Sequence, residues 1–303
     1  MIDVVAPAAE RQGEPVGRRA RRTARRRRGA GRSLAYHATL CIASLVMLYP
    51  LLWMLASSFK PEDEIFGNVS LWPSSVSLAA YWRGWSGLQV SFGTFFWNSL
   101  VISTLSVIGN VFSCSLAAYA FARLRFKGRN FWFALMLGTL MLPYHVTLIP
   151  QYVLFLGLGW VDTFLPLVVP KFLAADAFFI FLLVQFFRAI PRELDEAAML
   201  DGCGPWRTYW TIILPLSLPA LATAAVFTFI WTWDDFFGPL VYLSDMNNYT
   251  VQLGLRSFVD SSGKSDWGAL LAMSVVTLLP VFALFIFFQR LLIEGIATTG
   301  LRG

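Results

Sequence analysis

The sequence has few of the residues on which soluble enzymes depend. Charged residues make up 14% of its 303 residues, whereas a soluble domain carries about a quarter. It has two histidines, His37 and His145, and no His-Glu-x-x-His pattern, which argues against zinc-dependent hydrolysis. Its three cysteines, Cys41, Cys114 and Cys203, are odd in number and widely spaced. They indicate neither a disulfide framework nor a metal site.

Hydrophobic residues are abundant instead, at 57% of the chain, and the mean hydropathy is +0.61. Such a chain must face lipid over much of its surface. Because lipid tolerates no open sheet edge, we predict an all-α membrane protein.

Six apolar runs have the length of a membrane-spanning helix, which needs about 20 apolar residues. The expected spans are about 36–57, 97–121, 131–155, 165–187, 216–241 and 267–291. Residues 34–303 should therefore form one transmembrane domain. Prolines at positions 50, 143, 150, 170 and 280 interrupt several spans, which predicts kinked helices around a cavity.

Residues 1–33 are polar and end in an arginine-rich run, which predicts a disordered basic tail. A nucleic-acid tail and a secretory signal are alternatives. The apolar run that follows is too long for a signal, and basic residues commonly hold the cytoplasmic end of a span against anionic lipid. We favour this membrane role and expect no nucleic-acid partner.

Basic residues between the spans predict the orientation of the chain. They gather in residues 123–129 and again in residues 188–207. Both loops fall on the side of the N-terminus, so both termini should be cytoplasmic. The longer loops, about 59–94 and 243–266, then lie outside and are available to a partner.

Residues 188–215 form a polar loop between two long apolar runs. Pro191 suits the first position of a helix, and Gly202 can end that helix in a left-handed conformation. A second short helix is expected from Pro205 to Leu214, where Pro215 interrupts it. The pair is too short and too charged to cross a bilayer, so we predict a cytoplasmic docking element.

Small and acidic residues give this element its expected surface. Ala197 and Ala198 lack bulk, so another protein could approach their backbone closely, and Glu196 offers a charge to a basic partner. An ordinary amphipathic surface helix is the simpler alternative. A DNA-reading helix pair is disfavoured, because phosphate would repel the acidic first helix.

The loop carries the pattern Glu-Ala-Ala, three residues, Gly, nine residues, Ile-x-Leu-Pro. Its members are Glu196, Ala197, Ala198, Asp201, Gly202, Ile212, Leu214 and Pro215. With the aromatic segments 186–191 and 227–233 on either side, it resembles the integral membrane subunits of ABC importers. The similarity is to the carbohydrate-uptake branch, specifically the shorter membrane subunit of the maltose transporter, and it covers roughly residues 34–303.

The resemblance implies a type I importer permease fold in a bacterial inner membrane, with a loop that couples to an ATPase. It also implies partners: a second homologous permease, two ATP-binding subunits and an extracytoplasmic substrate-binding protein. We expect a non-catalytic chain that binds no cofactor, since ATP and Mg²⁺ are used by the partner ATPase. Gly263-Lys264-Ser265 imitates a phosphate loop, but Phe258 stands where that motif requires glycine.

Polar residues inside the spans are candidates for the transport path, because ionisable groups in hydrocarbon are expected to pair or to line water. One wall of a sugar site could comprise Asp176, Trp231, Trp233, Asp234 and Asp235. Alternatively, Lys171 extends to the interface, Asp176 pairs with a partner subunit, and the aspartates and tryptophans lie at the outer interface. Where the family usually has Asn, this chain has Asp234.

Two other functions remain open on the sequence. One is import of a glycerol phosphodiester or phosphate ester, for which Lys171 is the intramembrane cation. The other is a polytopic membrane enzyme with Asp234 and Asp235 as a carboxylate pair. Adjacent residues on a helix point about 100° apart, so these two could not readily share one substrate proton.

Overall fold

The computed structural model describes residues 16–67, 70–259 and 265–300. Within these ranges the regular structure is helical and contains no strand, in agreement with the all-α prediction. The chain divides into two compact units, residues 1–54 and residues 55–303. In the segment Gly263-Lys264-Ser265, which imitates a phosphate loop, only Ser265 lies within the described residues.

Helix α1 (Val16–Ser57) contains the first apolar run, and its part Tyr36–Ser57 is long enough to cross a membrane. The helix continues back to Val16, whereas the sequence analysis expects a disordered tail as far as residue 33. The difference has a physical reason, because alanine and arginine both have high helix propensity and extend an existing helix. Residues 1–15 of the predicted tail lie outside the described residues.

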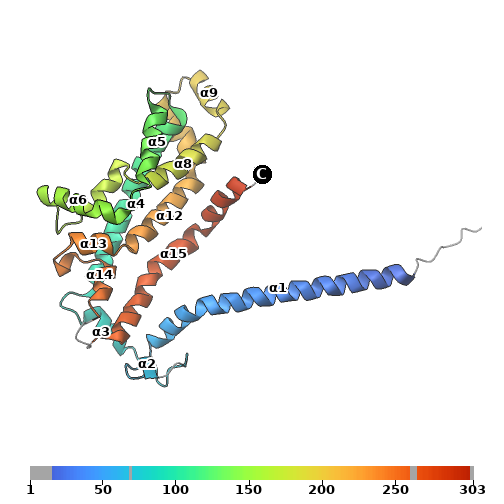
Figure 1. The fold of residues 1–303 in the computed structure, drawn as a ribbon, viewed down its shortest axis with the longest axis vertical. Helices are drawn as coiled ribbons and strands as arrows, with labels where there is room; N and C mark the ends of the chain where they lie inside the picture. Colours follow the sequence, from blue (N-terminus) through green and yellow to red (C-terminus); the bar gives the residue numbers. More distant parts are fainter. Residues whose placement is uncertain (1–15, 68–69, 260–264, 301–303) are drawn as a thin grey trace, which may run out of the picture. The chain divides into compact units, whose positions relative to one another are not determined.

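The second unit holds the remaining helices. They are α2 (Glu64–Gly67), α3 (Ala79–Ser86), α4 (Phe92–Arg123), α5 (Arg129–Thr139), α6 (Tyr144–Gly157), α7 (Leu165–Val168), η1 (Val169–Leu173), α8 (Ala177–Ala189), α9 (Glu193–Leu200), α10 (Pro205–Thr208), η2 (Tyr209–Ile213), α11 (Leu214–Leu216), α12 (Leu218–Trp233), α13 (Phe237–Tyr242), η3 (Met246–Asn248), α14 (Val251–Arg256) and α15 (Trp267–Gly300). Figure 1 shows α9 at one end of this unit, and α3 and α14 at the other.

Helix α4 is the centre of the second unit, and both α8 and α12 pack along it. Its 32 residues make a helix about 48 Å long, which exceeds the thickness of the hydrocarbon core. Small and polar residues fill its buried face, including Ser99, Ser103, Ser106 and Asn110. Such residues let helix backbones approach closely, and Asn110 donates a 2.7 Å hydrogen bond to Thr228 Oγ1 of α12.

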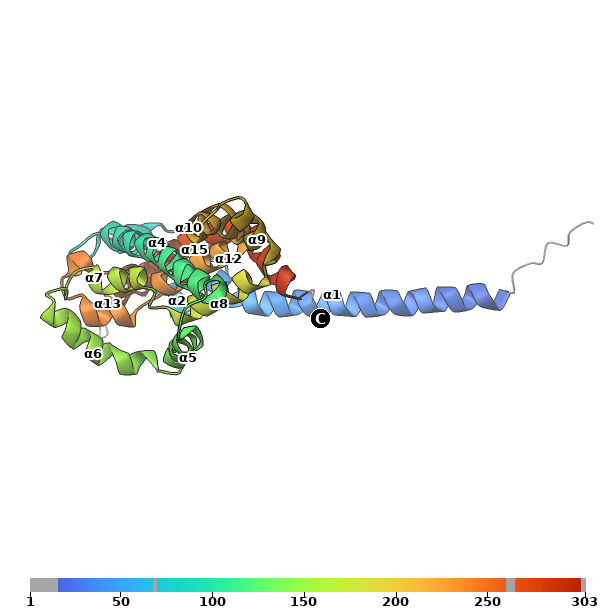
Figure 2. The same cartoon turned by 90° about the horizontal axis from the view of Figure 1, so that it is seen from above.

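The predicted span 131–155 is a bent pair of helices, and a second bent pair covers residues 205–233, which overlap only part of the predicted span 216–241. Helices α5 and α6 meet at 100°, and the segment Pro205–Leu216 meets α12 at 77°. The described chain therefore has four helices long and apolar enough to cross a membrane, or up to six if each bent pair is one span. Figure 2 shows α5 and α6 along one edge of the second unit.

The predicted span 165–187 is also irregular at its start, although Leu165–Ala189 qualifies as one span. The 3₁₀ turn η1 ends at Ala174, whose φ of 53° is left-handed. Side chains of α4 bind the backbone released there, because Ser113 Oγ donates to the Lys171 carbonyl over 2.7 Å. Non-helical backbone at membrane depth is tolerated only where it is satisfied in this way.

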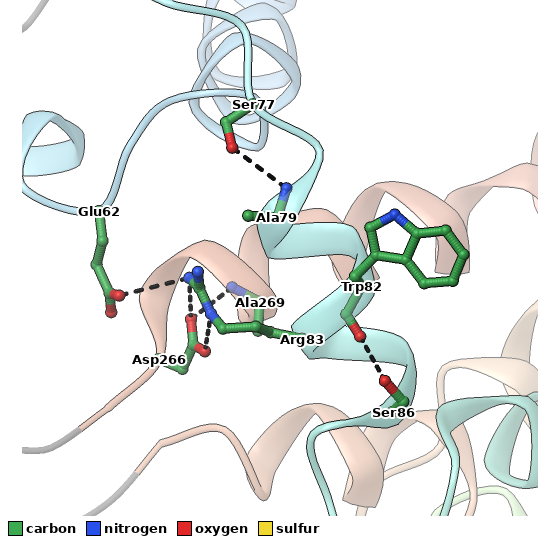
Figure 3. A network of polar contacts seen from close by, with 8 residues as sticks. All are labelled: Glu62, Ser77, Ala79, Trp82, Arg83, Ser86, Asp266 and Ala269. Carbon is green, nitrogen blue, oxygen red and sulfur yellow. Dashed lines mark hydrogen bonds and ion pairs between the residues drawn. The ribbon is translucent and has the colours of Figure 1, made fainter.

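An arginine ties three segments together at the end of the unit opposite α9 (Figure 3). Arg83 of α3 donates through Nε and a terminal nitrogen to both carboxylate oxygens of Asp266, at 2.9 and 3.2 Å, and more weakly to Glu62. Asp266 also accepts the Ala269 N–H at 2.8 Å and so caps the start of α15. The network holds Glu62 and α3 against the first turn of α15.

Asp162 forms a second tie between distant segments. Its φ of 63° is unusual for a residue other than glycine. Its carboxylate accepts the N–H groups of Asp245 and Ser244, each at 2.9 Å, and these bonds lower the pKa of the carboxyl group. The connection between α6 and α7 is thus fixed to the segment that follows α13.

Candidate functional site

The polar loop contains the first short helix that the sequence predicts, α9, which begins two residues after Pro191. Glu193, Asp195 and Glu196 occupy its first turn, where negative charge is favourable. At its other end Gly202 has a φ of 77° and donates its N–H to Met199 O over 3.1 Å. The Cys203 N–H donates to Ala198 O over 2.8 Å, which completes a Schellman motif. The predicted left-handed helix end at Gly202 is confirmed.

The outer face of α9 combines apolar and acidic groups that the described chain leaves open. Leu200 is 90% exposed and Met199 is 63% exposed, while Glu196 and Ala197 are exposed beside them. Ala198 is different, because it is only 4% exposed and faces the rest of the chain. The expectation that both alanines present a bare backbone therefore holds for Ala197 and is wrong for Ala198.

The second part of the motif lies in a helical segment that packs rather than protrudes. The segment runs through α10, η2 and α11 and ends at Leu216, one residue beyond Pro215, instead of stopping at Leu214. Ile213 is fully buried in the core between α4 and α8, and Ile212 and Leu214 pack against that core. The Ile-x-Leu-Pro pattern thus fixes the loop to the bundle, while α9 carries the open surface.

Three side chains of α4 hold this loop, and they repeat every four residues along one face of the helix. Ser115 Oγ and Tyr209 Oη lie 2.8 Å apart, and Tyr119 Oη donates to the Pro205 carbonyl over 2.8 Å. Arg123 completes the row in the last turn of α4. The loop is therefore attached to the central helix at three points.

Arg123 is the strongest of these attachments. Its side chain is only 4% exposed and forms a 2.7 Å ion pair with Asp195 of α9. It also donates to the carbonyls of Phe187 and Ile190, at 2.6 and 2.7 Å, where α8 ends. One guanidinium group thus joins the ends of α4 and α8 to the first turn of α9.

Sequence reasoning assigned Arg123 only to the basic loop that orients the chain, and it did not select Ser115 or Tyr119. A signal was present, since the three residues are four apart and lie at the end of a span. Their partners lie between 64 and 94 residues away in the sequence. Only the folded chain shows that they meet.

The polar residues of the fourth span form a pair within this chain. Lys171 Nζ and Asp176 Oδ2 lie 2.8 Å apart, and each side chain is about 30% exposed. Asp176 precedes α8 directly, and Lys171 belongs to η1. Asp176 thus has an internal partner, and its pairing with a helix of another subunit stays a prediction.

The two tryptophans of the predicted wall have different environments. Trp231 is 51% exposed and packs at a tilt against Phe178 and Phe179 of α8, with ring centroids 5.3 and 5.1 Å away. Trp233 is 1% exposed, and its Nε1 donates to the Thr277 carbonyl of α15 over 3.1 Å. Trp233 is thus a core residue and offers no face to a sugar in this structure.

The neighbouring aspartates also have local partners. Asp235 Oδ1 accepts the Gly238 N–H at 3.2 Å and so caps α13. Asp234, which is exposed, accepts from Gln252 Nε2 at 3.4 Å. The two carboxylates therefore serve different segments, which is unfavourable for the shared proton of a catalytic pair.

The two tryptophans provide a matched test of the predicted transport path, because each can be replaced by alanine and they lie only two residues apart. We expect Trp231→Ala to reduce transport by several-fold while thermal stability changes little, since half of the ring is open. We expect Trp233→Ala to lower stability by roughly 3–5 kcal/mol through loss of a buried ring. Melting of the purified chain and uptake rates measure both effects. Unchanged uptake in Trp231→Ala would remove Trp231 from the path.

Comparisons with known proteins match most of the chain. A family model described as "Binding-protein-dependent transport system inner membrane component" matches residues 109–297. The chain is 35% identical over 259 residues to the probable ABC transporter permease protein YurM of Bacillus subtilis, covering 86% of this chain and 85% of that protein. It is 34% identical over 263 residues to the trehalose/maltose transport system permease protein MalG of Thermococcus litoralis, covering 86% and 94%.

A further relative is the sn-glycerol-3-phosphate transport system permease protein UgpE of Yersinia enterocolitica, with 32% identity over 275 residues, 88% of this chain and 96% of that protein. Among solved structures, a chain of a bacterial ABC transporter involved in the import of the acidic polysaccharide alginate superimposes with a TM-score of 0.75. That match has 23% identity and covers 85% of this chain and 95% of the other. The shared fold is the type I importer permease fold.

Proposed function

Because the chain belongs to the family of binding-protein-dependent transport system inner membrane components, we propose that it is a permease subunit of a sugar importer driven by a separate ATPase. The observation that carries this proposal is the attachment of α9. Its outer face is open and mixed apolar and acidic, while Arg123 fixes its base to α4 and α8. A surface helix attached in this way can transmit a force from a partner protein to the membrane-spanning helices α4 and α8.

In the proposed mechanism α9 is the coupling helix, and it docks in a cleft of an ATP-binding subunit. Closure of two such subunits pulls α9 and its counterpart on a second, homologous permease together. Arg123 and Tyr119 pass this movement to α4, and the cavity between the permeases opens outward. ATP and Mg²⁺ are used by the partner subunits, and this chain binds no cofactor and catalyses no reaction.

The proposed location is a bacterial plasma membrane, with both termini and α9 in the cytoplasm. The basic loop between α4 and α5 and the basic residues around α9 support this orientation, because such residues remain inside. The segments tied by Arg83 and by Asp162 then lie outside. They offer a fixed surface to an extracytoplasmic substrate-binding protein.

Carbohydrate is favoured over a phosphate ester as the substrate. The trehalose/maltose permease supports a sugar, whereas the sn-glycerol-3-phosphate permease supports the alternative. Phosphate recognition needs an available cation, and Lys171 is already neutralised by Asp176 at 2.8 Å. The partly exposed Trp231 offers an apolar ring face of the kind that stacks on sugars.

Reconstitution of the full complex in liposomes tests this proposal. Binding protein loaded from a panel of sugars, with glycerol 3-phosphate as a separate arm, is added from outside. We expect a sugar to raise ATP hydrolysis several-fold and glycerol 3-phosphate to have no effect. Stimulation by the phosphate ester alone would reverse the substrate assignment. Turnover of any compound by the isolated chain would indicate a membrane enzyme instead.

A further inference from the structure

A hollow of about 530 Å³ lies where α4 passes into α5, close to the start of α9. Three arginines from two separate parts of the chain line it. Arg125 and Arg129 come from the α4–α5 connection and the start of α5, and Arg192 directly precedes α9. The rest of the lining is Phe126, Gly128, Asn130 and Phe131.

No carboxylate lines this hollow, and none of its three arginines belongs to an ion pair among the described residues. Asp195 and Glu196 line an adjoining hollow, which Arg125 and Arg192 also border. Arg129 donates one long hydrogen bond of 3.3 Å to the Leu124 carbonyl. By contrast, the buried Arg123 nearby is paired with Asp195. Three guanidinium groups around one space indicate an anionic ligand.

The surroundings of the hollow place it at the level of lipid headgroups. It lies where the spanning helix α4 ends and the apolar helix α5 begins. Phe131 lines it and is 65% exposed, and the adjacent Trp132 is 54% exposed. Exposed aromatic residues at helix ends are typical of the membrane–water interface.

We infer that this hollow binds the phosphodiester headgroup of an anionic lipid, with Arg125, Arg129 and Arg192 on the phosphate oxygens. Basic pockets at the cytoplasmic ends of spans suit such headgroups. The acyl chains of the lipid lie against Phe131 and Trp132, contacts that a free phosphate cannot make. Because Arg192 adjoins α9, the bound lipid joins the α4–α5 connection to the start of the coupling helix.

Native mass spectrometry of the full-length chain, after exchange with defined lipids in detergent, tests this site. The probes are phosphatidylglycerol and phosphatidylcholine with the same acyl chains, and glycerol phosphate as the headgroup without chains. We expect wild type to retain phosphatidylglycerol over phosphatidylcholine. The triple variant Arg125→Gln, Arg129→Gln, Arg192→Gln should bind phosphatidylglycerol at least about tenfold more weakly, since each arginine near the surface contributes to the attraction.

The matched control removes charge from the same region without touching the hollow. Lys127→Gln lies in the same loop, and Arg188→Gln removes an arginine that stacks on Phe133 at 5.1 Å. This double variant should retain phosphatidylglycerol within about twofold of wild type, because neither residue lines the hollow. Equal loss in the control, or equal retention in the triple variant, would overturn the site. Displacement of the lipid by free glycerol phosphate at equal concentration would show that the chains play no part and would also overturn it.

The lipid site is independent of the substrate. A finding that the transporter carries a phosphate ester would leave the lipid site unaffected. Failure of the lipid-binding assay would disprove the lipid site even if sugar transport were confirmed. A contact of the three arginines with an acidic surface of the ATP-binding subunit is the competing explanation. It predicts that the triple variant loses that subunit on purification and keeps the lipid, which would contradict the inference.

Discussion

Replacement of Gly202 by valine is expected to separate ATP hydrolysis from sugar uptake while the chain still inserts into the membrane. Gly202 has a φ of 77°, a conformation that strains a β-branched residue by about 1–2 kcal/mol. The strain acts on the Schellman bonds that end α9, so the exposed Leu200 and Met199 change position relative to their partner. No apolar span is altered. Retention of the ATPase subunit and sugar uptake are measured in the same membranes.

Gly204 provides the matched control two residues away. Its φ of −75° suits any residue, and a Cβ there would meet nothing within 4 Å. We therefore expect Gly204→Val to keep both retention and uptake near wild type. Glu196→Lys, which reverses an exposed charge on α9, should resemble Gly202→Val. Normal retention together with normal uptake in both Gly202→Val and Glu196→Lys would show that α9 is not the coupling element.

The features that the sequence predicted well are those that local interactions decide. The end of α9 depends on Gly202 and its immediate neighbours, and the first apolar run depends on composition alone. Composition alone does not determine the extent of α1, because repulsion between arginines favours a disordered tail whereas their helix propensity favours a longer helix.

Features that depend on contacts between distant residues could not be predicted from the local sequence. Trp231 and Trp233 lie two residues apart, so they point to nearly opposite sides of α12. Trp233 is the buried one, packed against Phe96 and Phe229 and bonded to the Thr277 carbonyl 44 residues away. Prolines such as Pro143 indicate that a span is interrupted, but the 100° angle between α5 and α6 depends on the packing around both helices.

Replacement of Arg123 by glutamine is expected to lower stability and impair coupling together. The Arg123–Asp195 pair is largely buried, and removing one partner of such a pair typically costs about 3–5 kcal/mol. The value here should fall toward the lower end, because Asp195 is 21% exposed and water can reach it. The carbonyls of Phe187 and Ile190 also lose their donor. We expect the purified chain to melt several degrees lower, with more ATP hydrolysed for each sugar transported.

A second variant separates the lost charge from the lost connection. In Arg123→Gln combined with Asp195→Asn no unpaired carboxylate remains, so part of the stability should return. Coupling should stay impaired, because two amides replace the guanidinium group that joins α4, α8 and α9. Arg123→Lys keeps the charge but cannot reach Asp195 and both carbonyls in the same geometry, so it should be intermediate. If Arg123→Gln melted and transported like wild type, the connection from the loop to the central helix would have to run through Tyr119, Ser115 and the packing of Ile213.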